Sequence, residues 1–180
     1  MVSRRRLLAL LSALGLSSRG ASRAAEPIKI LFVDTGNTGR SLMAETLARD
    51  LAARPPAPLV FISRGLDVDP FDESPEANAR ILMAQRGFDL SLHRARRLEA
   101  SDAAHADLIL TMTPEHARKL VAAHPDARAK TFTLARYATG SDEPIPDAWG
   151  KPMEAYRAVV AQLDRLLPLA LAKAARVTPS

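Results

Sequence analysis

The stretch IKILFVDTGNTGRS, residues 28–41, decides the fold class of this 180-residue chain. Apart from Lys29, its first six residues are large and apolar, and several are β-branched, which is typical of a buried strand. The residues that follow, 34–41, are small or polar and lead into a helical pattern over 40–53. A buried strand that passes through a short glycine-containing loop into a helix predicts the first unit of a parallel sheet.

The rest of the chain repeats this alternation. We expect further strands at 59–62, 107–112 and 131–134, and helices at 75–86, 114–123 and 153–175. Pro168 is expected to disturb the last helix locally. No internal repeat or linker divides residues 26–180, so we expect a single domain. The pattern predicts an α/β fold in three layers, with a four-stranded parallel sheet and helices on both faces.

Composition narrows the possible function classes. The chain contains no cysteine, which excludes disulfides, thiolate metal ligands and thiol catalysis. Five arginines in residues 1–25, where no acidic residue occurs, account for the whole formal net charge of +5. The remaining domain balances its charges, and we therefore expect no nucleic-acid-binding surface. No metal-ligand spacing or cofactor motif stands out, so we expect no metal and no cofactor.

Residues 1–25 resemble an export signal. An arginine run at 4–6 precedes an apolar stretch at 7–16, and small residues follow as far as Ala25. This order matches the charged, apolar and cleavage regions of a signal peptide, and Ser-Arg-Arg before leucines resembles the twin-arginine type. The apolar stretch is too short to span a bilayer, so we expect a periplasmic protein with no membrane span after cleavage. A transit peptide or a disordered start is the alternative.

The loop at 34–41 has the features of an oxyanion site. Ligands of open α/β sheets bind beyond the carboxyl ends of the strands, where helix N-termini present N–H groups and a positive dipole. Arg40 can add a bidentate guanidinium, and Asn37 tolerates left-handed backbone. The loop is not the nucleotide P-loop, because Asp34 and Arg40 replace its first glycine and its lysine. The residues expected to bind the anion are Thr35, Gly36, Asn37, Thr38, Gly39, Arg40 and Ser41.

Five segments of the chain match the motifs of one known family in the same order. They are DTGNTGRS at 34–41, SRG at 63–65, GFDLSLHRAR at 87–96, DLILTM at 107–112 and IPDAWG at 145–150. These segments resemble the phosphate-binding loop C-x-x-G-N-x-x-R-S and the later motifs of the low-molecular-weight protein tyrosine phosphatases. The resemblance covers roughly residues 28–175. It implies a four-stranded parallel sheet with helices on both sides and a site for phosphorylated side chains.

The resemblance fails at the residue that attacks the phosphate. Where the family has its nucleophilic cysteine, this chain has Asp34. The resemblance implies that Arg40 holds the phosphoryl group and that Asp147 protonates the leaving group, while Ser41 supports the nucleophile. A carboxylate reaches one bond further than a thiolate, and its charge opposes a phosphate dianion. We therefore expect loss of tyrosine phosphatase activity, with Asp34 accepting N–H groups of its own loop and pairing with Arg40.

Further departures lie around the same site. Gly39 replaces a second cysteine that the family often has, and the loss of both thiols is consistent with an oxidising compartment. Ala148 replaces the usual proline after the acid, which leaves the placement of Asp147 open. Trp149 either forms an aromatic wall of the pocket or packs within its loop.

The remaining histidines show no metal-ligand pattern. We expect His93, which lies in a matched segment, to make a structural hydrogen bond. His116 is expected on the surface.

The sequence leaves three functions open. The first is a pseudophosphatase that binds a phosphate-like anion or a phosphotyrosine-bearing protein without hydrolysing it. The second is a phosphatase with altered chemistry, in which Asp34 acts as nucleophile or base and Asp147 as general acid. The third is a structural remnant whose loop is filled by its own carboxylate. No feature of the sequence indicates an oligomeric state.

Overall fold

The computed structural model describes residues 26–53 and 57–176. It contains a four-stranded sheet with the strand order β2-β1-β3-β4, in which every neighbouring pair is parallel. The strands are β1 (Ile28–Asp34), β2 (Leu59–Gly65), β3 (Leu108–Thr111) and β4 (Thr131–Thr133). The predicted α/β fold with a four-stranded parallel sheet is confirmed.

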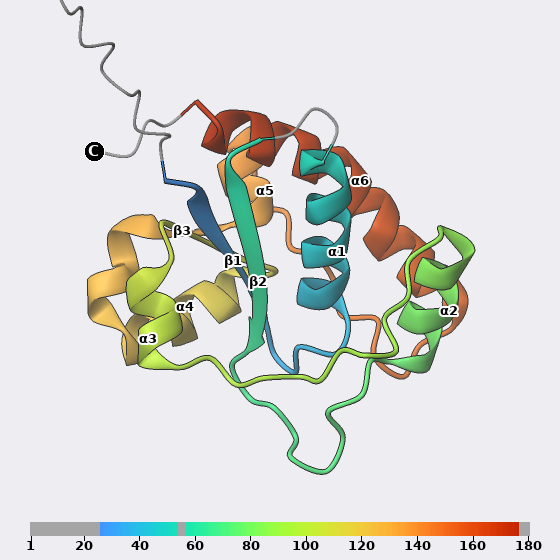
Figure 1. Cartoon of the computed structure of the whole chain (residues 1–180). Coiled ribbons are helices and arrows are strands. Elements are labelled where there is room, and N and C mark those ends of the chain that lie inside the picture. The colour runs from blue at the N-terminus through green and yellow to red at the C-terminus, as the bar shows by residue number, and fades with distance from the viewer. Residues whose placement is uncertain (1–25, 54–56, 177–180) are drawn as a thin grey trace, which may run out of the picture.

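Helices cover both faces of this sheet (Figure 1). They are α1 (Arg40–Ala52), α2 (Ala77–Gln85), α3 (Ala100–His105), α4 (Pro114–Ala123), α5 (Leu134–Thr139), α6 (Met153–Ala174) and the 3-10 helix η1 (Pro125–Lys130). Helices α1, α5 and α6 lie on one face, and α3, α4 and η1 lie on the other. In the described residues, none of these helices is long and apolar enough to cross a membrane.

The central strand β1 is buried on both faces, which explains the consecutive apolar residues at 30–33. Ile30 and Phe32 face the larger core beneath α1 and α6, whereas Leu31 and Val33 face the smaller core beneath α3 and α4. All four side chains are at most 1% exposed. A parallel strand buried on both faces does not alternate apolar with polar residues, so consecutive apolar residues in the sequence predict it.

The structure differs from the predicted elements at several short segments. Helices α3, α5 and η1 were not predicted, because six-residue segments are too short for a clear apolar period. Leu134 was expected to end a strand but begins α5, which is capped by the Thr133 hydroxyl accepting the N–H of Arg136. Helix α6 continues through Pro168 without interruption. The predicted export signal at 1–25 lies outside the described residues and stays a prediction.

Gly65 lets the chain after β2 approach the loop after β1. It is the register partner of Asp34, and the N–H groups of Leu66 and Asp67 donate to the carbonyls of Asp34 and Thr35. A Cβ atom on Gly65 would lie 2.7 Å from the Thr35 carbonyl oxygen and 2.7 Å from Cγ2 of Val68. This position therefore accepts no side chain without displacing the start of the loop.

We predict that Gly65→Ala destabilises the protein by about 1–3 kcal/mol, the usual range for overpacking. The matched control is Gly36→Ala, whose Cβ would meet only Thr38 Oγ1, at an ordinary 3.5 Å. Its stability is expected to stay within about 1 kcal/mol of the wild type. Urea denaturation followed by circular dichroism measures both. Equal stabilities of the two variants would contradict the close approach at Gly65.

Candidate functional site

The candidate site lies at the carboxyl ends of the strands, where the loop 34–41 joins β1 to α1. Two other segments meet it there, 66–76 after β2 and 145–150 before α6. The second segment is attached to the sheet because the N–H of Ile145 donates to the carbonyl of Met112 at 2.9 Å. That bond brings Asp147 over a loop more than a hundred residues earlier in the chain.

The Asp34 carboxylate is held by its own loop. Its side chain is buried, with Oδ1 accepting the Asn37 N–H at 2.7 Å and Oδ2 accepting the Ser41 N–H at 2.9 Å. The expectation that Asp34 accepts N–H groups of its loop is confirmed. Five further N–H groups of the loop find no acceptor within residues 26–53 and 57–176. They belong to Thr35, Gly36, Thr38, Gly39 and Arg40.

Asn37 fixes the shape of the loop. Its backbone is left-handed, with φ 58°, and its side chain is fully buried. The amide group donates to the hydroxyls of Ser41 at 3.0 Å and Ser63 at 2.9 Å, and its oxygen accepts the Arg96 N–H at 3.0 Å. His93 Nε2 donates to the Asn37 carbonyl at 2.8 Å, which confirms the structural hydrogen bond expected of this histidine.

Arg40 does not pair with Asp34. The guanidinium is buried and donates to the Ile145 carbonyl at 3.2 Å, and its Nη2 lies 3.4 Å from Oδ1 of Asp147. The expected Asp34–Arg40 pair was wrong, because the Asp34 carboxylate turns into the loop while Ile145 and Asp147 hold the guanidinium from outside. The structure thus brings Arg40 and Asp147 together despite Ala148 in place of proline.

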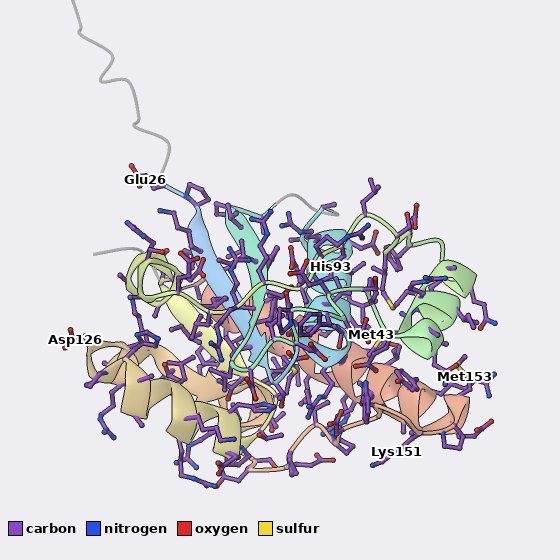
Figure 2. All side chains as sticks on the ribbon, turned by 90° about the horizontal axis from the view of Figure 1, so that it is seen from below. Glu26, Met43, His93, Asp126, Lys151 and Met153 are labelled. Atoms are coloured by element: carbon purple, nitrogen blue, oxygen red, sulfur yellow. The ribbon has the colours of Figure 1, made fainter. Side chains whose placement is uncertain are left out.

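A pocket of about 800 Å³ opens above the loop. Trp149 lines it with 69% of its surface exposed, so the ring forms a wall and is not packed within its loop. The basic residues that line the pocket are Arg40 and Lys151. Lys151 lies two residues before Met153, the first residue of α6, and Figure 2 labels both. The acidic residues that line it are Asp34, Asp67, Asp69, Asp72, Glu76 and Asp147. The pocket therefore combines the free N–H groups of the loop with a negatively charged rim.

In the part of the chain that the structure describes, no group of three or more histidine, aspartate or glutamate side chains is arranged to hold a metal ion.

Glu76 is a site residue that the sequence did not indicate. Its carboxylate accepts the hydroxyls of Thr38, at 3.1 Å, and Tyr156. Burial raises the pKa of Glu76, with smaller upward contributions from the charges of Asp34 and Asp147, while the two hydrogen bonds oppose the rise. A Cβ on Gly39 would lie 2.5 Å from Glu76 Oε1, so Glu76 occupies the space that a side chain at position 39 would need.

His116 is a second residue that the sequence did not indicate. It was expected on the surface, but it is only 6% exposed because the first turn of α4 packs behind the loop. Its Nε2 lies 3.0 Å from the Thr35 hydroxyl. Burial, together with the positive charge of Arg40, lowers the pKa of His116 to about 4.

We predict that His116 makes the protein lose stability as the pH falls. Its pKa is about 4 in the folded protein and near 6.5 in the unfolded chain, so between these values only the unfolded state takes up the proton. The linked loss between pH 7 and pH 4 is roughly 3 kcal/mol. Urea unfolding across this range should show a smaller loss for His116→Gln. Glu76, whose raised pKa acts in the opposite direction, is present in both the wild type and His116→Gln. Equal losses of stability in these two proteins would therefore contradict a buried neutral histidine.

Comparison with known proteins identifies the family. The model of the family described as low molecular weight phosphotyrosine protein phosphatase matches residues 29–177. A protein-arginine-phosphatase of Geobacillus stearothermophilus is 33% identical over 144 residues, which cover 78% of this chain and 92% of that protein. The low molecular weight protein-tyrosine-phosphatase Etp of Escherichia coli is 35% identical, with 76% and 87% covered.

A solved structure is similar to the chain as well. It is the YwlE arginine phosphatase in a cysteine-to-serine mutant whose active-site serine is phosphorylated. It aligns with a TM-score of 0.76 and 32% identity, and the match covers 81% of this chain and 94% of that one. Fold, loop geometry and these similarities agree, and the chain belongs to the low molecular weight phosphotyrosine protein phosphatase family.

Proposed function

We propose that this protein is a pseudophosphatase, a domain that holds a phosphorylated side chain in the loop 34–41 without hydrolysing it. One observation carries the proposal. The Asp34 carboxylate, which the loop motif aligns with the nucleophilic cysteine of the family, is held by two N–H groups, while five other N–H groups of the loop have no acceptor among the described residues. Converging free N–H groups at a helix N-terminus bind phosphate oxygens.

Asp34 is poorly suited to attack a phosphate. Both of its oxygens already accept hydrogen bonds that hold them in the loop. Two unit charges 4 Å apart interact with about 4 kcal/mol at the effective dielectric of a partly buried site, so a dianion is repelled by the carboxylate. Arg40 is engaged by Asp147, so it only partly offsets this repulsion. Binding therefore requires that the hydrogen bonds from the free N–H groups outweigh the remaining repulsion.

The charge of the pocket favours one class of ligand. Six carboxylates and two basic residues line it, so a phosphate on a neutral or acidic stem meets a repulsive rim. A phosphorylated guanidinium has an anionic end for the loop and a cationic stem for the rim. The names of the YwlE and Geobacillus relatives assign activity on phosphorylated arginine to those proteins. We propose phosphoarginine in a protein as the preferred ligand and phosphotyrosine as a weaker one.

A second candidate function is a phosphatase that uses the carboxylate. The phosphorylated serine of the YwlE mutant favours it, because it shows that an oxygen atom in an active site of this family can carry the phosphoryl group. In such a reaction an Asp34 oxygen attacks phosphorus, the bond to the leaving group breaks, and Asp147 gives that group its proton. Water then hydrolyses the acyl phosphate and regenerates Asp34.

Three forms of the protein distinguish these functions: the wild type, Asp34→Cys and Asp34→Asn. We expect no hydrolysis of aryl phosphate or phosphoarginine by the wild type, turnover by Asp34→Cys, and none by Asp34→Asn. Phosphoarginine should quench or shift Trp149 fluorescence in the wild type, and Asp34→Asn should bind about tenfold more tightly because one opposing charge is lost.

Two other outcomes would support the alternative functions. Turnover by the wild type that Asp34→Asn abolishes would establish the carboxylate enzyme. If neither calorimetry nor Trp149 fluorescence detects phosphoarginine, phosphotyrosine or orthovanadate, the loop is a structural remnant and the proposal is wrong.

A further inference from the structure

The site contains one polar atom that the interactions described so far do not explain. Within the described residues, His116 Nδ1 is buried and has no hydrogen-bond partner. The other ring nitrogen, Nε2, lies 3.0 Å from Thr35 Oγ1. A buried polar atom without a partner costs free energy, so its presence calls for a reason in the rest of the site.

The unpartnered nitrogen determines which tautomer of His116 fits. A neutral imidazole has one N–H donor and one acceptor nitrogen. With its proton on Nδ1, His116 would bury an N–H without an acceptor, which is the rarer kind of unsatisfied group. With the proton on Nε2, only a lone pair is left unpaired. His116 therefore donates its Nε2–H to the hydroxyl of Thr35.

This donation leaves the hydroxyl proton of Thr35 available. Thr35 is exposed, lines the pocket and stands next to Gly36, whose N–H is among the free ones of the loop. Thr38, the other threonine of the loop, is different because its hydroxyl donates to Glu76. The hydroxyl proton of Thr38 is thus used within the protein, whereas that of Thr35 is free at the pocket.

We propose that Thr35 is a ligand-binding residue, whose hydroxyl donates to an oxyanion in the loop, and that His116 is the positioning residue that orients it. This inference rests on the proposed binding function. It adds a side-chain donor to the backbone N–H groups at the mouth of the loop. Since His116 holds Thr35 by a neutral hydrogen bond, it adds no charge to the pocket.

The tautomer is tested directly on the full-length protein without ligand. Long-range ¹H–¹⁵N correlation spectra distinguish the two ring nitrogens of each histidine, and His116→Gln identifies the signals of His116. We expect a protonated Nε2 and an unprotonated Nδ1 at pH 7. A proton on Nδ1 would overturn the inference, because Thr35 would then donate to His116 and have no proton for a ligand.

Affinity for orthovanadate tests the role of Thr35. We expect Thr35→Val to lose about tenfold in affinity, as for one hydrogen bond to a charged group, and Thr35→Ser to stay near the wild type. The control is Thr46→Val, because the Thr46 hydroxyl donates to the Leu42 carbonyl within α1 and does not line the pocket. This control should bind as the wild type does.

His116 variants separate positioning from packing. His116→Gln keeps an N–H donor near Thr35 and should retain most of the affinity, whereas His116→Phe fills the space without a donor and should lose about as much as Thr35→Val. If Thr35→Val binds orthovanadate like the wild type, the inference is wrong while the proposed function stands. If the wild type itself does not bind, both fail.

Discussion

The two hydrogen bonds from the N–H groups of Asn37 and Ser41 to the Asp34 carboxylate are the interaction on which the site depends. A loop that leads from a buried strand into a helix directs several N–H groups to one point and needs an acceptor there. Asp34 supplies a permanent acceptor that belongs to the chain. The loop is therefore held in shape without a ligand, and its charge is partly neutralised before any anion arrives.

The other features of the site are consistent with this constraint. Because Asp34 accepts hydrogen bonds inside the loop, Arg40 is free to bind Ile145 and Asp147 from the neighbouring segment. Glu76 fills the space above Gly39 and bonds to Thr38 and Tyr156, which adds one more carboxylate beside the loop. The result is a loop with free N–H groups in an acidic pocket, and the proposed binding of a phosphorylated cationic side chain rests on this combination.

Local sequence features predicted much of this arrangement. The apolar side chains of β1 and the left-handed backbone of Asn37 depend on near neighbours, and the structure agrees with both. The partner of Arg40 and the places of Glu76 and His116 depend on contacts between distant segments. Thr35 and His116 are 81 positions apart, and no spacing rule connects a loop to the first turn of a later helix. Such contacts arise from packing, which a single sequence does not encode as a pattern.

The most direct test of the central claim is the backbone ¹H–¹⁵N spectrum of the full-length protein during titration with orthovanadate. We predict that the N–H signals of Thr35, Gly36, Thr38, Gly39 and Arg40 move as they bind the anion. The signals of Asn37 and Ser41 should stay near their starting positions, because Asp34 keeps them. If the Asn37 and Ser41 signals move as far as the other five, the anion displaces the carboxylate, and the claim that Asp34 permanently holds the loop is contradicted.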